Sequence, residues 1–281
     1  MKTITILAVF TVLCCLGIFL VNPALAGNPR SKIVVDGSTT VGPIAKSFAE
    51  YYMRMNPVVN ITVSESGSGN GAKSLINGTC DVANMSRFMK EKEFKAAVDK
   101  GIFPVAHVVA VDGIAIIVHP SNRVKSLTIE QVRDIYLGKT KNWNKVGGTN
   151  KRIVIISRDT NSGTYETFEK LVMKKQKITQ NAEYVGSNGA IRTRVQSTKA
   201  AIGYVGLGFI DKSVKAVKID NIYPDNNSDS SGKYPIARPL FMFTNGYPKL
   251  GTHLHAFVTL YLSEKGQEII ESIGFIPITK Y

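Results

Sequence analysis

The chain has 281 residues, of which 44% are apolar and 20% are charged, and this composition excludes a disordered chain and a protein with many membrane spans. At roughly 150 residues per domain, the length fits one large domain or two modest lobes. Lysine and arginine number 35 against 21 acidic residues, so the net charge is +14 and an anionic partner is expected. The charge alone leaves nucleic acid, an anionic surface and a small anion as candidates.

The first 26 residues have the pattern of a secretory signal peptide. Lys2 precedes an apolar run over residues 4–21, and Pro23 is followed by Ala-Leu-Ala at residues 24–26. We expect cleavage after Ala26 rather than an uncleaved membrane anchor, although the run is long enough for one. The mature protein would then lie in the periplasm. Because a protein of the cell envelope rarely meets nucleic acid, the small anion becomes the favoured partner.

Signal-peptide removal changes the cysteine content more than the charge. Cys14 and Cys15 lie inside the apolar run, so the mature chain keeps Cys80 alone and forms no internal disulfide. Residues 1–26 hold one basic residue and no acidic residue, which leaves a mature net charge of +13. The mature protein is therefore still strongly basic.

Short β-rich runs alternate with helical patterns along the mature chain. Strands are predicted, in chain order, at residues 32–36, 59–64, 105–111, 114–118, 152–157 and 202–205, and helices at 43–55, 128–137, 164–175 and 254–271. Thr128 and Gln131 form a capping box at the start of the second helix, which ends at Gly138. Residues 221–234 are rich in Asn, Asp, Ser and Gly and are predicted to form a surface loop. The alternation predicts an α/β fold with open sheets, in which ligands bind at the carboxyl ends of strands.

Short hydroxyl side chains and glycines gather where predicted strands give way to helices. Residues 37–40 (Gly-Ser-Thr-Thr) follow the first strand, and residues 158–164 (Arg-Asp-Thr-Asn-Ser-Gly-Thr) follow the strand at 152–157. Between them lie residues 66–71 (Ser-Gly-Ser-Gly-Asn-Gly) and 86–87 (Ser-Arg). Each junction offers hydroxyl groups and helix N-terminal N–H groups, and the two arginines can add forked, charge-assisted hydrogen bonds. Together these features indicate a site for phosphate or a similar oxyanion.

Each junction also has a simpler interpretation. Ser, Thr and Gly at helix starts are common caps, and residues 66–71 can be an ordinary flexible turn. The same glycines are a near miss for a P-loop, since Ala72-Lys73-Ser74 stands where that motif needs Gly-Lys-Ser. Arg158 can pair with Asp159 or a surface carboxylate. The repetition of one chemistry at several junctions favours the anion site over these alternatives.

Eight segments are spread, in order, over essentially the whole mature chain: DGSTTVGP, SGSGNG, DVANMSR, SLTIEQVRDIYLGKTKNW, SRDTNSGTYETF, AIGYVGLGF, PIARPL and EKGQEIIESIGFIPI. In this order they resemble the phosphate-binding proteins of bacterial phosphate ABC transporters. The resemblance implies the two-lobed α/β fold of type II periplasmic binding proteins, with two open sheets joined by a two-crossover hinge near residues 109–113 and 237–241. Lobe 1 would hold residues 30–110 and 238–281, lobe 2 would hold residues 111–237, and phosphate would be buried between them.

The resemblance also assigns phosphate-binding roles to particular residues. They are Ser38, Thr39, Thr40, Ser66, Ser68, Ser86, Arg87, Arg158, Ser162, Gly163 and Thr164. Well-known members carry an aspartate where Arg87 stands, and that aspartate accepts a hydrogen bond from protonated phosphate and helps to exclude sulfate. Because Arg87 can only donate, the sequence supports affinity for an oxyanion more strongly than discrimination against sulfate.

Catalysis is disfavoured by the small number of candidate residues. The four histidines, His107, His119, His253 and His255, have the spacing of neither a HExxH helix nor a zinc finger, so we expect no metal and no cofactor. The sequence also has no Gly-x-Ser-x-Gly elbow. The favoured interpretation is a monomeric phosphate receptor that serves the membrane permease subunits of an ABC importer. Receptors for sulfate or molybdate, a secreted phosphatase and a basic surface adhesin are the alternatives.

Overall fold

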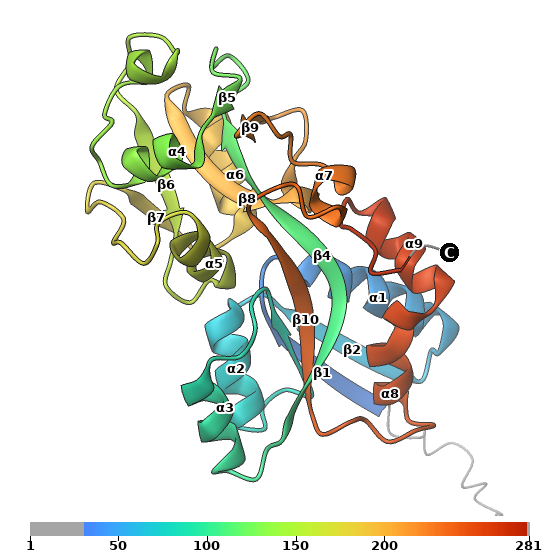
Figure 1. Cartoon of the computed structure of the whole chain (residues 1–281). Coiled ribbons are helices and arrows are strands. Elements are labelled where there is room, and N and C mark those ends of the chain that lie inside the picture. Colours follow the sequence, from blue (N-terminus) through green and yellow to red (C-terminus); the bar gives the residue numbers. More distant parts are fainter. Residues whose placement is uncertain (1–30, 280–281) are drawn as a thin grey trace, which may run out of the picture.

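The computed structural model describes residues 31–279, and the predicted signal peptide lies outside this range. Within it, no helix is long and apolar enough to cross a membrane. Two long strands, β4 (Pro104–Val118) and β10 (Ala237–Asn245), run side by side through the molecule and join two groups of elements (Figure 1). We call these groups lobe 1, which holds both ends of the described chain, and lobe 2.

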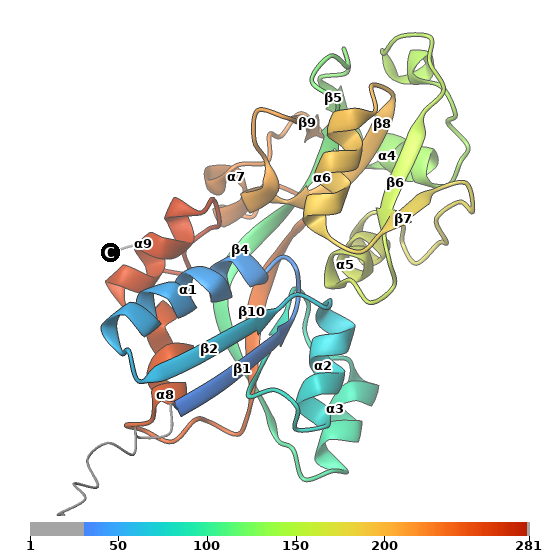
Figure 2. The same ribbon diagram turned by 180° about the vertical axis from the view of Figure 1, so that it is seen from behind.

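Lobe 1 has a sheet with helices on both of its faces. Its elements are β1 (Ser31–Gly37), α1 (Gly42–Met55), β2 (Val59–Ser64), α2 (Ser68–Ile76), β3 (Val82–Met85), α3 (Glu91–Val98), α8 (His253–Val258), η4 (Thr259–Leu262) and α9 (Glu264–Ser272). Helix α1 begins with a proline in its first turn and buries Ile44, Phe48 and Tyr52, which recur at helical spacing. Figure 2 shows α1, α8 and α9 on one face of the sheet and α2 and α3 on the other.

Lobe 2 has the same α/β character. Its elements are β5 (Ser126–Leu127), α4 (Ile129–Tyr136), η2 (Trp143–Val146), β6 (Val154–Arg158), α5 (Gly163–Leu171), β7 (Glu183–Val185), α6 (Asn188–Ser197), β8 (Ala201–Gly206), η3 (Leu207–Phe209), β9 (Lys215–Ile219) and α7 (Asn226–Ser230). In its core, the ring of Phe168 from α5 stacks on Tyr204 from β8 with centroids 4.0 Å apart. This packing holds α5 against the sheet.

The strand order places the ends of parallel strands from both lobes at one gap. Hydrogen bonds connect the strands in the order β2-β1-β3-β10-β4-β8-β6-β7, and β9 pairs with β4 and β5. β1 is parallel to β2 and β3 in lobe 1, and β6 is parallel to β7 and β8 in lobe 2. β4 and β10 are antiparallel, with Asp112 opposite Arg238 where the chain passes between lobes. The loops after β1, β3 and β6 therefore face one another.

The two-lobed α/β fold predicted from the sequence is confirmed, and some element boundaries differ. The predicted strands 105–111 and 114–118 form the single strand β4, because Asp112 and Gly113 continue the ladder with β10. The predicted helix 254–271 is broken at Ser263, whose hydroxyl accepts a hydrogen bond from the N–H of Gly266 and starts α9. The helix predicted at 164–175 ends at Leu171, and the predicted loop 221–234 contains the short helix α7. The predicted capping box of α4 is confirmed, since Thr128 and Gln131 bond reciprocally.

Candidate functional site

A small cavity lies between the loops that the two lobes place face to face. It is lined by Ser38, Thr39, Thr40, Gly67, Ser68, Ser86, Arg158, Ser162, Gly163 and Thr164. Of these residues, Arg158 is the only one with a charged side chain, and none is a carboxylate. The cavity therefore favours a small anion.

Three helices begin at this cavity. Thr40 and Thr164 lie at the starts of α1 and α5, and Ser68 is the first residue of α2. The first N–H groups of a helix have no intrahelical partner, and they carry the positive end of its dipole. Ser162 caps α5 by accepting a hydrogen bond from the N–H of Tyr165 at 3.1 Å. Three converging helix N-termini are an arrangement that binds oxyanions.

Arg158 supplies the positive charge of the cavity. Its side chain is 1% exposed and donates to the Thr39 hydroxyl at 3.2 Å and to the carbonyls of Gly186 at 2.8 Å and Val185 at 3.3 Å. Burial lowers the pKa of the Arg158 guanidinium to about 10, so the group stays charged at neutral pH. The carboxylate of Asp159 is 4.0 Å from Nη2, at the limit of an ion pair. An anion in the cavity would therefore be the strongest partner for this charge.

Arg87 lies outside the cavity lining. Its two terminal nitrogens bond to the Glu93 carboxylate at 2.8 Å, and its Nε is 2.9 Å from the carboxylate of Glu166. Lys90 is also 2.9 Å from Glu166. Arg87 and Lys90 belong to lobe 1 and Glu166 belongs to α5 of lobe 2, so these ion pairs bridge the lobes. We call this group of three residues the interlobe ion-pair cluster.

Ser66 is the second member of the predicted set that does not line the cavity. It is exposed, and its hydroxyl donates to the carboxylate of Asp36 at 2.7 Å. Gly67 lines the cavity in its place. The structure brings together the other nine predicted residues, which are Ser38, Thr39, Thr40, Ser68, Ser86, Arg158, Ser162, Gly163 and Thr164.

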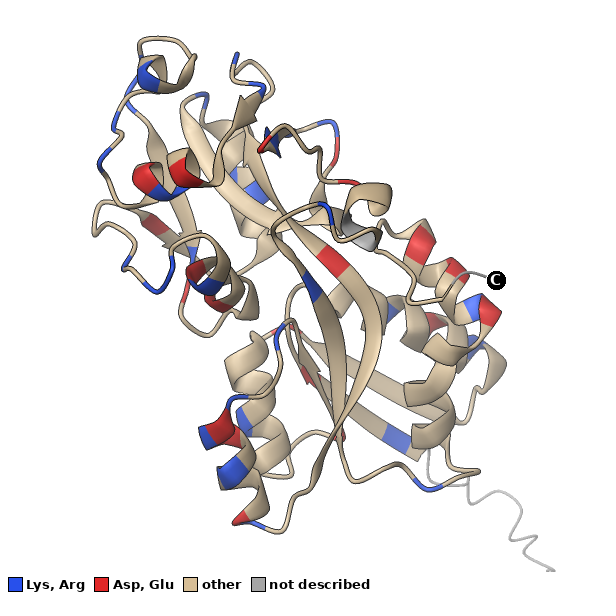
Figure 3. Cartoon of the chain, in the orientation of Figure 1, with Lys and Arg blue, Asp and Glu red and all other residues tan. Residues whose placement is uncertain are grey.

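Three buried polar residues next to the cavity were missed by the sequence reasoning. Arg238 of β10 and Asp112 of β4 form an ion pair at 3.0 Å between the two crossover strands, whose charged positions are coloured in Figure 3. Asn188, the first residue of α6, donates from Nδ2 to the hydroxyls of Thr39 and Thr40 at 3.0 and 2.9 Å. The sequence held a signal for two of these residues. Asp112 is the single charged residue of the apolar segment VDGIAIIV, and Arg238 is that of the segment PIARPL.

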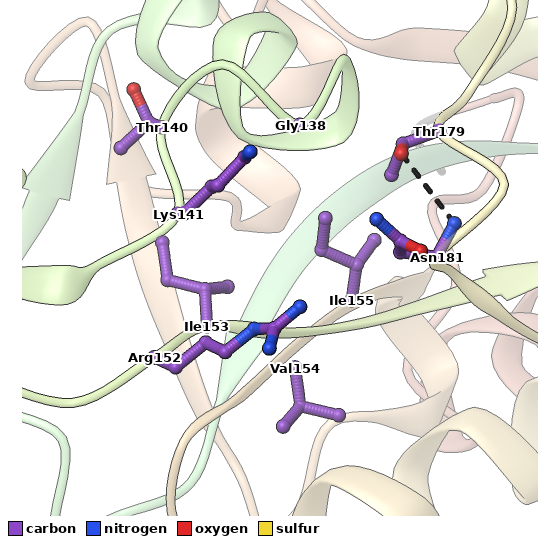
Figure 4. Close-up of a pocket in the computed structure, with 9 residues that line it drawn as sticks. All are labelled: Gly138, Thr140, Lys141, Arg152, Ile153, Val154, Ile155, Thr179 and Asn181. Atoms are coloured by element: carbon purple, nitrogen blue, oxygen red, sulfur yellow. Dashed lines mark hydrogen bonds between the residues drawn. The ribbon is translucent and has the colours of Figure 1, made fainter.

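A second, larger hollow lies on the surface of lobe 2. Its lining residues are Gly138, Thr140, Lys141, Arg152, Ile153, Val154, Ile155, Thr179 and Asn181 (Figure 4). Lys141 and Arg152 are exposed, and Thr179 accepts a hydrogen bond from the N–H of Asn181 at 3.4 Å. The basic groups are solvated and the walls are mainly aliphatic. The interlobe cavity, with its buried charge, is therefore the stronger candidate.

Comparisons with known proteins agree with this geometry. Residues 22–265 match a family described as the PBP superfamily domain. The phosphate-binding protein PstS of Staphylococcus saprophyticus is 33% identical over 267 residues, which are 91% of this chain and 83% of the relative. PstS of Bacillus subtilis is 32% identical over 256 residues, with 88% and 81% covered.

A crystal structure from Clostridium perfringens has a similar fold. It is a putative phosphate ABC transporter substrate-binding protein with bound phosphate, has a TM-score of 0.82 and 33% identity, and is matched over 89% of this chain and 100% of that chain. These matches show that the chain belongs to the PBP superfamily and, within it, to the family of PstS phosphate-binding proteins.

Proposed function

We propose that this protein is an extracytoplasmic receptor that captures inorganic phosphate in the interlobe cavity and delivers it to the permease subunits of an ABC importer. The observation that carries the proposal is a cavity where three helix N-termini, seven hydroxyl side chains and one buried arginine meet, contributed by both lobes. The names of its relatives give phosphate as the ligand of the family. In this proposal the signal peptide is cleaved after Ala26 and the mature protein acts as a monomer.

Capture requires that phosphate exchange its water shell for protein donors. Hydroxyls, backbone N–H groups and Arg158 replace that shell, and buried charge-assisted hydrogen bonds are stronger than exposed ones. Donors come from lobe 1 at residues 38–40, 68 and 86, and from lobe 2 at residues 158 and 162–164. Because both lobes contribute, the closed form binds best, and the ligand shifts an opening and closing equilibrium about residues 109–113 and 237–241. The permease would then recognise the closed form.

The chemistry of the cavity supports binding rather than catalysis. Hydroxyl groups line it, but none of its ten lining residues is a histidine or carboxylate able to act as a general base. Within residues 31–279, no group of three His, Cys, Asp or Glu side chains is placed to hold a metal ion.

Titration calorimetry of the mature protein with phosphate, sulfate, molybdate and a phosphate ester tests the proposal. We expect one phosphate to bind per chain and the ester to give no heat. Absence of heat with every anion would overturn the receptor function, and turnover of the ester would establish an enzyme instead. Tight binding of sulfate or molybdate with no response to phosphate would reassign the ligand.

The absence of a carboxylate from the cavity lining predicts a particular pH dependence. With a pKa of about 10, Arg158 keeps its charge from pH 5 to pH 8, and sulfate stays doubly charged over that range. Sulfate affinity should therefore change less than about twofold. Phosphate loses its second proton in the same range, and a site made of donors favours the form with more acceptor oxygens, so phosphate affinity should rise severalfold towards pH 8. Tighter phosphate binding at pH 5 would contradict this prediction.

The interlobe ion-pair cluster should stabilise the closed form. Glu166→Gln removes the charge that holds Arg87 and Lys90 across the gap, while Arg87 keeps its bonds to Glu93. We expect phosphate to bind about two- to fivefold more weakly, since partly exposed ion pairs contribute about 0.5–1 kcal/mol. The matched control is Glu183→Gln, because Glu183 pairs with Arg194 at 2.8 Å within lobe 2. Equal phosphate affinities for the two variants would contradict the role of the cluster.

A further inference from the structure

A hydroxyl group can donate or accept a hydrogen bond, and an anion requires that it donate. Which way a hydroxyl points is set by the groups that occupy its two lone pairs. Two buried side chains, Asn188 and Arg238, are 0% and 5% exposed, and both donate to hydroxyls at the cavity. Neither of them is among the residues that line it.

The hydroxyl of Thr39 is held as a donor towards the cavity. Its oxygen accepts from Nη1 of Arg158 at 3.2 Å and from Nδ2 of Asn188 at 3.0 Å. These two donors fill both lone pairs, because neither a guanidinium nor an amide NH₂ can accept. The single hydrogen of Thr39 is left for an acceptor in the cavity that Thr39 lines.

Thr40 and Thr164 contact the same two side chains. Thr40 accepts from Nδ2 of Asn188 at 2.9 Å, and its hydroxyl lies 3.0 Å from that of Thr164. The two hydrogens of Nη2 of Arg238 go to the Asp112 carboxylate at 3.0 Å and to Thr164 at 2.9 Å, and its contact with Thr40 at 3.4 Å is weaker. Asn188 therefore donates to the hydroxyls of two neighbouring threonines at the cavity.

The two orienting side chains are themselves fixed. Oδ1 of Asn188 lies 3.4 Å from the N–H of Gly206, a donor, which places the NH₂ end of the amide towards the two threonines. Arg238 donates to the Asp112 carboxylate at 3.0 Å and to the Ser86 carbonyl at 3.1 Å. These contacts hold both side chains in place within the protein.

We propose that Asn188 is a positioning residue that makes Thr39 a hydrogen-bond donor towards the bound oxyanion. This inference rests on the proposed function. One side chain of lobe 2 thereby sets the hydroxyl of Thr39 in lobe 1, and Arg158 occupies the other lone pair of that hydroxyl.

The test is a double-mutant cycle read as the dissociation constant of inorganic phosphate. We expect Asn188→Ala to weaken binding at least about tenfold in the wild-type background. In the Thr39→Val/Thr40→Val background, the hydroxyls through which Asn188 acts are gone, and the same change should alter binding less than about twofold. Equal losses in the two backgrounds would overturn the positioning role.

Two further variants separate orientation from structural support. Asn188→Asp keeps the shape of the side chain but only accepts, so it should lose at least as much affinity as Asn188→Ala, and wild-type affinity would overturn the proposal. Ser187→Ala removes the cap of α6, which accepts from the N–H of Ala190 at 3.0 Å, and should lower the melting temperature while changing phosphate affinity less than about twofold. A loss for Ser187→Ala as large as that for Asn188→Ala would indicate helix stability alone and overturn the positioning role.

The same measurements distinguish the two levels of inference. If the wild-type protein does not bind phosphate, the proposed function is wrong. If the wild-type protein binds phosphate and the Asn188 variants bind it equally well, only the positioning role is wrong.

Discussion

Replacement of Arg158 by alanine is expected to weaken phosphate binding by about 30- to 800-fold, which corresponds to about 2–4 kcal/mol. Arg158 is the only charged residue of the cavity lining, and its guanidinium is almost fully buried. Its removal leaves the anion without a charge partner in a site that excludes water. It also removes one of the two donors that orient the Thr39 hydroxyl.

Two further substitutions make the Arg158 result interpretable. Arg158→Lys keeps a positive charge but loses the planar fork, and we expect it to recover only part of the affinity. Arg152→Ala removes an exposed arginine two residues before β6, the strand that ends with Arg158, and it should leave phosphate affinity unchanged within about twofold. A change of less than threefold for Arg158→Ala, measured by calorimetry at constant ionic strength, would place Arg158 outside the binding site.

The high positive charge of the chain does not itself form the binding site. The basic residues are spread over both lobes (Figure 3), and one of them, Arg158, lines the cavity. The other basic residues can steer an anion towards the protein through long-range potential, which salt screens. Specific recognition is a property of hydroxyls, helix N-termini and Arg158.

The sequence was informative where chemistry and local structure coincide. Residues 37–40 and 158–164 each combine a strand end, a helix start and hydroxyl side chains, so one short window predicts both the turn and its potential ligands. The structure places the two windows on opposite sides of one cavity. Local capping rules were equally reliable for Thr128 and Gln131.

The sequence was uninformative where a residue's role depends on a distant partner. Arg87 follows a strand, as Thr39 and Ser38 do, yet its guanidinium is drawn to Glu93 and to Glu166, which is far along the chain. Asn188 lies in a helix with little hydrophobic pattern, and only the packing of α6 brings it to Thr39. Such contacts are set by tertiary packing, which no local periodicity encodes.

Gly163 gives the second large expected effect, because it packs directly against residues of the other lobe. A Cβ atom at Gly163 would be 2.5 Å from the Ser68 hydroxyl and 2.6 Å from the Ser86 hydroxyl. Gly163 belongs to lobe 2, and both serines belong to lobe 1. An alanine at this position therefore forces both serine hydroxyls to move in the closed arrangement, whereas alanine at the first position of α5 is favourable for the helix itself.

We expect Gly163→Ala to weaken phosphate binding by about 5- to 150-fold, since overpacking costs about 1–3 kcal/mol. The melting temperature of the ligand-free protein should change little, because the clash exists only when the lobes are closed. Small-angle scattering should show no phosphate-induced compaction at phosphate concentrations that compact the wild type. Gly186→Ala is the matched control, since its Cβ would meet nothing within 4 Å and its carbonyl remains available to Arg158. Wild-type affinity and compaction in Gly163→Ala would mean that phosphate binds without the close approach of the two lobes, and that the donors from α5 are not needed for capture.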